Sequence, residues 1–430
     1  MLELLLGYFI KVNESNISLL KIIETENSVI GIGNRLNENN IGEIVILKFS
    51  NDGNLIFSKS IYSNKYLIFS DAVYRNGKIY IIGTIPIENE GNNILFICID
   101  TNANILISRY FSVINYESPS AITILNDKIY IIGNMNPLNN IPRMFFLITD
   151  TLGIPKFLKI AYFLVNFTNL KGFFIENNNI YVYGDYFDNK RIPFVFKFDS
   201  LFNLLEGKKF SLNTNLPILG FQKVNDSIFI LFDKYLLTLR SDWKILNIKS
   251  LSNLIPKFLN YSNTLEIFGI FNNKPFYYVL DRHFPILKYV NISSNNLKYA
   301  KNYILFNSTT DYLFSKNLTN CDAFQYQLFY LNDVNLNLTV ENFPITLISF
   351  SIPFSQVSLY IKDINTSISY VCPTSAIKDE NFEISYDKFY EVYKIDGTFL
   401  GKLKPKNLKK GIYILKDGKK YKKFFKPHTP

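Results

Sequence analysis

The chain has 430 residues, a formal net charge of +10 and a hydrophobic fraction of 48%, which suits two or three ordinary domains or one large repeat array with an appendage. Aromatic residues make up 16% and only three cysteines occur, which excludes a disulfide framework and a mostly disordered protein and favours a β-rich one. Residues 394–430 hold twelve Lys and two Asp, a charge of +10, which leaves zero for the preceding 393 residues. The basicity therefore belongs to the tail and predicts no nucleic-acid-binding face on the main body.

The N-terminal segment makes a poor signal peptide. Residues 1–10 are apolar but short, carry Glu3, and lack a basic start and a small-residue cleavage site. No apolar run approaches the roughly 18 residues that a membrane-spanning helix needs. We expect either a cytoplasmic protein or one whose leader has been removed or lies upstream of Met1.

One short stretch, Lys-Ile-Tyr-Ile-Ile-Gly at residues 78–83, recurs in seven variants. Their first apolar residues are 29, 79, 129, 180, 228, 265 and 303, at steps of 50, 50, 51, 48, 37 and 38, a period in the range of β-propeller blades. Four alternating segments surround each copy, in the second unit at 67–75, 78–83, 93–100 and 105–111. The pattern predicts an all-β, seven-bladed β-propeller over residues 1–320, with short loops in the last units.

The turn between the third and fourth predicted strands is also periodic. Asp100, Asp150 and Asp199 open it in three units, and Ser50 stands at the same place in the first. Asp opens such turns by accepting a hydrogen bond from the backbone two residues on. We interpret these residues as turn formers, and only residues 50–54 faintly resemble a calcium loop.

This repeat, a strand followed by an Asp-x-x-Gly-Asn-like turn and a strand such as residues 54–59, resembles the bacterial β-propeller repeat proteins of cell surfaces and secreted multidomain proteins. The resemblance covers roughly residues 1–320 and lacks the double glycine of kelch repeats. It implies a propeller fold and brings no catalytic motif.

The seventh unit contains only three strand candidates, at residues 297–301, 303–307 and 312–318. An unassigned strand at residues 4–12 precedes the first unit. Because an open ring would expose two long strand edges, we expect the N-terminal strand to close it.

A strand-rich extension at residues 321–374 is bounded by Cys321 and Cys372. Its alternation predicts three or four short strands that pack on the propeller or form a small sandwich. A disulfide between the two cysteines would close a loop of about fifty residues and stabilise the fold by roughly 3–4 kcal/mol, although two free thiols fit the sequence equally well. Cys98 lies in an apolar strand and is predicted to be a core residue.

Residues 380–430 predict a small basic β-sandwich, with Ile412, Ile414, Tyr421 and Phe424 as its core. The segment resembles the C-terminal sorting domain of proteins exported by the type IX secretion system, which implies recognition by secretion machinery and an extracellular or cell-surface location. The residues that carry the resemblance are Tyr393, Gly397, Leu408, Gly411, Tyr413 and Lys416. Lys394, where the family usually has Asp, and the missing signal peptide depart from the pattern, and a plain accessory β-domain remains the alternative.

Groups that carry chemistry are sparse. The chain has two histidines, His283 and His428, and no zinc-spaced Cys or His pair, phosphate-binding glycine loop or nucleophile elbow. We therefore predict no catalytic, cofactor or metal residues, and a secreted or surface propeller that acts as a binding or structural module for a protein or glycan. The alternative is an extracellular glycoside hydrolase or lyase acting on polysaccharide, which would gather carboxylates and aromatics at one end of the central channel.

Overall fold

The computed structural model describes residues 9–12, 16–51, 53–88, 90–112, 116–135, 143–162, 167–211, 215–251, 254–261, 265–272, 274–280, 286–290, 296–299, 303–307, 311–315, 324–328, 338–342, 346–350, 354–364, 366, 368–372, 389–394, 399–408, 411–417 and 420–426. Over these residues the chain is all-β. It forms eight antiparallel sheets of four or five strands and one 3-10 helix of three residues.

Four consecutive sheets take up the first half of the chain, and each receives a fifth strand from residues beyond 338. Sheet 1 contains β2 (Ile17–Glu24), β3 (Ser28–Leu36), β4 (Gly42–Ser50), β5 (Leu55–Tyr62) and β33 (Tyr360–Asp363). Sheet 2 contains β6 (Ile68–Arg75), β7 (Lys78–Ile87), β8 (Gly91–Asp100), β9 (Ile105–Phe111) and β32 (Phe354–Gln356). Sheet 3 contains β10 (Glu117–Leu125), β11 (Lys128–Met135), β12 (Arg143–Asp150), β13 (Pro155–Tyr162) and β31 (Thr346–Phe350). Sheet 4 contains β14 (Phe167–Glu176), β15 (Asn179–Asp188), β16 (Lys190–Phe198), β17 (Leu204–Ser211) and β30 (Thr339–Asn342).

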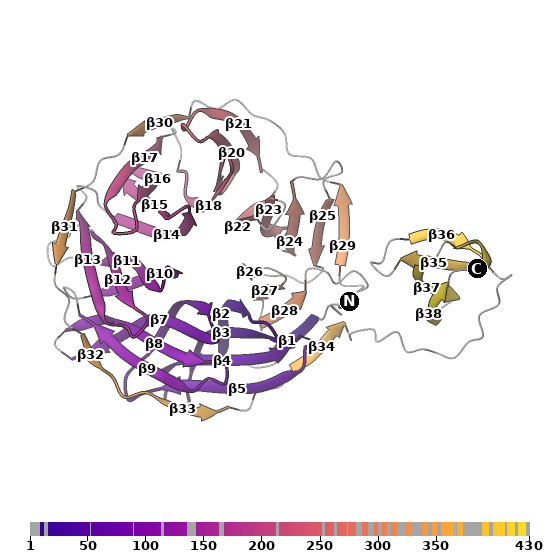
Figure 1. The fold of residues 1–430 in the computed structure, drawn as a ribbon, viewed down its shortest axis with the longest axis horizontal. Helices are drawn as coiled ribbons and strands as arrows, with labels where there is room; N and C mark the ends of the chain where they lie inside the picture. Colours follow the sequence, from indigo (N-terminus) through magenta and orange to yellow (C-terminus); the bar gives the residue numbers. More distant parts are fainter. Residues whose placement is uncertain are drawn as a thin grey trace.

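Three further sheets complete the main body. Sheet 5 contains β18 (Ile218–Val224), β19 (Ser227–Phe232), β20 (Tyr235–Arg240) and β21 (Ile245–Ser250). Sheet 6 contains β22 (Ile255–Tyr261), β23 (Leu265–Phe271), β24 (Lys274–Val279), β25 (Ile286–Val290) and β29 (Phe324–Leu328). Sheet 7 contains β26 (Asn296–Tyr299), β27 (Tyr303–Asn307), β28 (Asp311–Ser315), β1 (Phe9–Val12) and β34 (Ile368–Cys372). Figure 1 shows these sheets around a common centre, with the first strand of each sheet innermost.

The stretch that recurs in the sequence is the second strand of each sheet, from β3 to β27. In sheets 1, 2, 3, 4 and 6 its glycine lies opposite the residue that precedes a shift in register, a bulge in the innermost strand. A Cβ on Gly33, Gly83 or Gly184 would lie 2.0, 2.2 or 2.5 Å from a carbonyl oxygen of the innermost strand. At these positions only glycine leaves room for the carbonyl, whereas in sheet 5 Phe232 lies opposite the same shift.

The shortened fifth unit still holds four strands, because both its strands and its loops are short. Its second and third strands have six residues each, against nine or ten in sheet 4. Two residues, Asp233 and Lys234, connect β19 to β20.

Apolar clusters fill the space between neighbouring sheets. Between sheets 3 and 4 the cluster is rich in aromatic residues, with buried Tyr130, Phe146, Phe194, Phe196, Phe198 and Phe202. Aliphatic residues such as Ile32, Ile46, Ile81 and Ile97 fill the space between sheets 1 and 2. Cys98, predicted to be a core residue, is fully buried in the cluster between sheets 2 and 3.

The N-terminal strand lies in the last sheet. β1 pairs with β28 on one side and with β34 on the other, both antiparallel. The sheet built from the end of the array thus includes the beginning of the chain, and both edges of β1 are paired.

The extension at residues 321–374 takes the first of its two expected forms, because its strands pack on the ring and make no sheet of their own in the described part of the chain, although they number six where three or four were expected. We call β29–β34 the belt. Its strands pair in turn with the outermost strands of sheets 6, 4, 3, 2 and 1, and finally with β1 of sheet 7. The belt therefore runs around the ring against the order of the repeats, on the periphery in Figure 1. Outermost strands offer unpaired backbone groups, and the belt strands satisfy them.

The C-terminal region forms one sheet, apart from the ring in Figure 1. Its strands are β36 (Phe399–Leu403), β35 (Tyr390–Lys394), β37 (Gly411–Asp417) and β38 (Lys420–Lys426), in that order, with the 3-10 helix η1 at Pro405–Asn407. Its small core contains Tyr390, Val392, Leu408 and Leu415. Leu415 lies on the opposite face of β37 from Ile412 and Ile414, whose side chains are outside those described, so the core role of Ile412, Ile414, Tyr421 and Phe424 stays a prediction. The second layer of the predicted sandwich would have to come from residues outside those described.

Candidate functional site

The innermost strands all begin on the same face of the ring. Strands alternate in direction within each sheet, so the connection from every fourth strand to the next first strand returns to that face. We call it the linker face after these connections, for example residues 63–67. In the first of them the Leu67 backbone N–H donates to Gly42 O at 2.9 Å, which fixes the connection against the start of β4.

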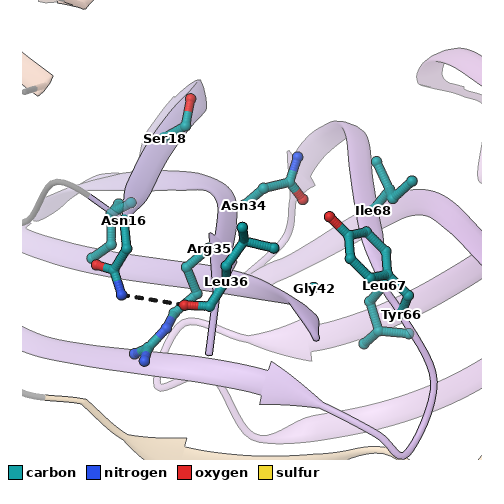
Figure 2. A pocket seen from close by; sticks show the side chains of 10 residues that line it. Asn16, Ser18, Asn34, Arg35, Leu36, Gly42, Tyr66, Leu67 and Ile68 are labelled. Carbon is teal, nitrogen blue, oxygen red and sulfur yellow. Dashed lines mark hydrogen bonds between the residues drawn. The ribbon is translucent and has the colours of Figure 1, made fainter. Parts of the chain in front are cut away.

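A pocket of about 360 Å³ opens on the linker face between sheets 1 and 2. The residues that line it come from the start of β2, the end of β3, the start of β4 and the linker into β6; they are Asn16, Ile17, Ser18, Asn34, Arg35, Leu36, Gly42, Tyr66, Leu67 and Ile68. Leu36, Tyr66 and Ile68 are 41–42% exposed. In Figure 2 Asn34 and Tyr66 reach toward the same side, while the guanidinium of Arg35 points away from them. The pocket thus combines apolar side chains with amide and hydroxyl groups, as ligand sites do.

Arg35, the one charged residue that lines the pocket, lies next to a buried carboxylate. Arg35 Nε lies 3.6 Å from Oε2 of Glu43, whose side chain is fully buried. Lys362 Nζ of the belt donates to Glu43 Oε1 at 2.6 Å, and Ser60 Oγ donates to Oε2 at 2.5 Å. Burial raises the pKa of Glu43, but the hydrogen bonds from Lys362, Ser60 and Asn37 lower it more, so it ends below its ordinary value. Glu43 is therefore a buried structural carboxylate and not a free acid or base.

A second buried carboxylate, Asp185, lies at the end of β15 on the same face. It follows Gly184, as Asn34 follows Gly33 in sheet 1. Arg191 Nη1 lies 3.5 Å from its Oδ1. Burial raises the pKa of Asp185 although the charges of Lys171 and Arg191 lower it. The charges that act on Asp185 in the described part of the chain come from two cations and not from a second carboxylate, the group that glycoside hydrolysis pairs with the first.

The periodic Asp residues act as turn formers in the structure. Asp100 Oδ1 accepts the backbone N–H groups of Asn102 and Asn104, each at 2.8 Å. Asp199 makes the same pair of bonds, and in the first unit Ser50 Oγ accepts the N–H of Asn54. Over the described residues no group of three His, Cys, Asp or Glu side chains is placed to hold a metal ion.

Some of the candidate site residues identified in the sequence lie outside the described residues, and the others lie in β34 or in the C-terminal region. Cys321 and Gly397 lie outside the described residues, as do His283 and His428. Cys372 ends β34 opposite Phe9, and the disulfide stays a prediction. Of the sorting-type residues, Tyr393 lies in β35, Leu408 is buried after η1, and Gly411, Tyr413 and Lys416 lie in β37. β35 and β37 are neighbours, so these residues share one sheet.

The pocket itself was missed by the sequence analysis. Its residues come from four segments that the repeat brings together, and none belongs to a known motif. If the linkers of sheets 1 and 2 are aligned so that their bulges coincide, Tyr66 falls at the position of Asn16. This exchange of asparagine for an aromatic residue is the signal that could have identified Tyr66.

No described helix is long and apolar enough to cross a membrane. No protein-family profile and no curated protein matches the chain. Among solved structures, the Pan2 WD40 domain of Neurospora crassa is similar at 9% identity and a TM-score of 0.46, over 70% of this chain and 90% of that one. The AfRom2 CNH domain is similar at 9% identity and a TM-score of 0.43, over 72% and 96%.

A subtype N10 neuraminidase-like protein of an A/little yellow-shouldered bat/Guatemala isolate is similar at 10% identity and a TM-score of 0.42, over 71% of this chain and 97% of that one. These neighbours are β-propeller proteins. At such identities and TM-scores, none of them tells what this chain binds or does.

Proposed function

We propose that sheets 1–7 are the blades of one seven-bladed propeller, closed by β1, and that the protein is a secreted or cell-surface binding module. Its ligand, a protein or a glycan, binds in the pocket on the linker face. The observation that carries the proposal is the pocket itself, where three large apolar side chains stay 41–42% exposed beside amide and hydroxyl groups. Exposed apolar groups gathered in a concave site are typical of binding surfaces.

A hydrolase receives less support. Glu43 is bound by Lys362, Ser60 and Asn37, and Asp185 faces Lys171 and Arg191. Both of these buried carboxylates are thus engaged by cations, and the two are not set up as a pair of acid and nucleophile.

Binding tests the pocket directly. Cell-surface extracts and polysaccharides would be immobilised and probed with the purified chain and with Tyr66→Ala. We expect the variant to lose about tenfold in affinity, since a central aromatic contact typically contributes this much. Tyr261→Ala is the matched control, because Tyr261 is 42% exposed and lies at the opposite end of its innermost strand. Equal binding by all three proteins would contradict the proposed site.

We propose further that the C-terminal sheet directs export through a type IX secretion system. Support comes from the resemblance of Tyr393, Leu408, Gly411 and Tyr413 to the sorting pattern and from a core separate from that of the ring. Residues 375–430 fused to a periplasmic reporter, in a host with this system, should carry the reporter out of the cell. A fusion that ends before β37 is the control, and retention of the full fusion in the periplasm would contradict export.

A further inference from the structure

One position in the linkers changes character around the ring. In each innermost strand of sheets 1 to 6 the register shift of the bulge follows one residue, which in β6 is Phe69. The position three residues before that one we call the entry position. In sheets 1 to 6 it is occupied by Asn16, Tyr66, Tyr116, Phe167, Asn215 and Asn253. Three consecutive sheets thus carry an aromatic residue where the other three carry asparagine.

The two asparagines at the entry position whose side chains are described, Asn16 and Asn215, each make a hydrogen bond to the backbone. Asn16 Nδ2 donates to Leu36 O at 3.2 Å, and Asn215 Oδ1 accepts the N–H of Arg191 at 2.9 Å. An aromatic ring has no amide with which to make these bonds. Sheets 2, 3 and 4 therefore give up a stabilising contact at this position, which a purely structural repeat would keep.

The two described aromatic rings are presented to solvent. Tyr66 is 41% and Tyr116 is 58% exposed. The Tyr66 ring lies against Gly42, where a Cβ would come within 2.6 Å of it, whereas a Cβ on Gly91 would make an ordinary contact with the Tyr116 ring at 3.5 Å. Glycine at position 42 therefore lets the Tyr66 ring lie close to the backbone, and both rings keep surface that a ligand can contact.

Tyr116 is also held in an unfavourable backbone conformation. Its φ is 59°, in the left-handed region that a bulky residue rarely adopts. A glycine or asparagine would fit this conformation with less strain. Strain kept at an exposed aromatic residue points to a role in binding.

Charge and chemistry indicate what the rings bind. Arg35, the charged residue in the pocket lining, shares the carboxylate of Glu43 with Lys362 and turns its guanidinium away from Asn34 and Tyr66 (Figure 2). The groups that lie near the Tyr66 ring in the pocket are therefore uncharged. Asn34 supplies an amide near the Tyr66 ring, with its Oδ1 accepting the Phe69 N–H at 2.7 Å, and Ser18 supplies a hydroxyl farther along the pocket (Figure 2). A sugar ring offers apolar C–H groups for an aromatic face and hydroxyls for amides, and a neutral sugar needs no counter-charge.

We propose that the linker face binds a neutral oligosaccharide, with one end in the pocket beside Tyr66 and the chain continuing over Tyr116. This rests on the proposed function and names its ligand class. A volume of about 360 Å³ is at the low end for ligand pockets, which suits the end of a sugar chain. Because Tyr116 belongs to the linker into the next sheet, only a longer ligand reaches it.

The test uses the full chain and neutral β-linked gluco-, xylo- and manno-oligosaccharides, each as disaccharide and hexasaccharide, with affinity measured by calorimetry. In the sugar series that binds, Tyr66→Ala is expected to lower the affinity for both the disaccharide and the hexasaccharide about tenfold. Tyr116→Ala is expected to weaken only the hexasaccharide, and Tyr261→Ala neither. Tyr116→Gly should lose hexasaccharide affinity while its melting temperature stays equal or rises, because glycine relieves the strain.

The outcomes separate this inference from the proposed function. No saccharide binding, with a protein or peptide captured in a Tyr66-dependent way, overturns the inference and leaves the binding module standing. Saccharide binding that Tyr66→Ala leaves unchanged overturns both. If Tyr116→Ala loses as much affinity for the disaccharide as for the hexasaccharide, the ligand does not extend over Tyr116 as proposed. A lower melting temperature in Tyr116→Gly shows that Tyr116 is structural.

Discussion

A chain that ends after Ser315, and so lacks the belt and the C-terminal sheet, is expected to lose about 5 kcal/mol or more of unfolding free energy. Six belt side chains, Leu338, Val340, Val357, Leu359, Ile361 and Ile364, pack against the clusters between sheets. At about 25 cal/mol per Å² of apolar surface, each partly buried aliphatic contributes about 1 kcal/mol. The outermost strands would also lose backbone partners and expose edges that favour aggregation.

Urea denaturation followed by tryptophan fluorescence would measure the loss, since Trp243 is 7% exposed within the cluster between sheets 4 and 5. The matched control ends after Cys372 and lacks only the C-terminal sheet. It should unfold at the midpoint of the full chain, because the C-terminal core is separate. A belt-free chain that stays monomeric and unfolds at the same midpoint would show that the belt adds no stability.

Local pattern was enough to locate the repeating strands. The apolar alternation and the glycine of residues 78–83 mark the second strand of each sheet, and the Asp turns mark the connection between the third and fourth. Both signals arise from contacts within a few residues, or across one hairpin, and such contacts leave a period in the sequence.

The belt left no comparable signal. Its strands have three to five residues, and the three of β32 are all exposed, so their alternation looks like that of any short hairpin. Their partners lie far away in the chain; Ser58 and Thr366, whose hydroxyls are 2.7 Å apart, are separated by 308 residues. Such pairing depends on where the strand edges lie in space, and this follows only from the assembled ring.

The candidate pocket escaped prediction for a related reason. Motif searches look for groups that react, whereas Tyr66 and Asn34 offer only a ring and an amide. Aromatic residues in strands fill the core in most cases, as Phe146 and Phe196 do, but Tyr66 and Tyr116 stay exposed. What distinguishes these two is their place at the entry position, which is defined by a bulge that only the strand register reveals.

Glu43 links the ring to the belt through Lys362, and its removal is expected to be costly. Glu43→Gln leaves the partly exposed Lys362 and the largely buried Arg35 facing a neutral amide. Breaking a buried ion pair in this way typically costs about 3–5 kcal/mol. Lys362→Met should cost less, because Arg35, Ser60 and Asn37 still satisfy Glu43 and because the Lys362 side chain is 39% exposed.

At acid pH the native chain and Glu43→Gln should have the same stability against unfolding. The folded-state pKa of Glu43 is depressed below its ordinary 4.5, so its contribution is fully present above the unfolded pKa and is lost as pH falls through the folded pKa. Urea midpoints from pH 7 downward should therefore converge for the two proteins below about 4.5. Turn carboxylates such as Asp199, whose pKa is also lowered, titrate equally in both proteins and cancel in the comparison.

The double variant Glu43→Gln/Lys362→Met identifies the coupling between the two residues. If the belt is held through this pair, the double variant loses less stability than the sum of the two single variants, since the second change removes a cation that the first left unpaired. Asp242→Asn, which breaks the half-exposed pair with Arg240, serves as the control and should change the midpoint little. Strict additivity at pH 7, or a difference between the native chain and Glu43→Gln that persists into acid, would show that Glu43 stabilises the ring through Ser60 and Asn37 alone and that the belt is held by its strands.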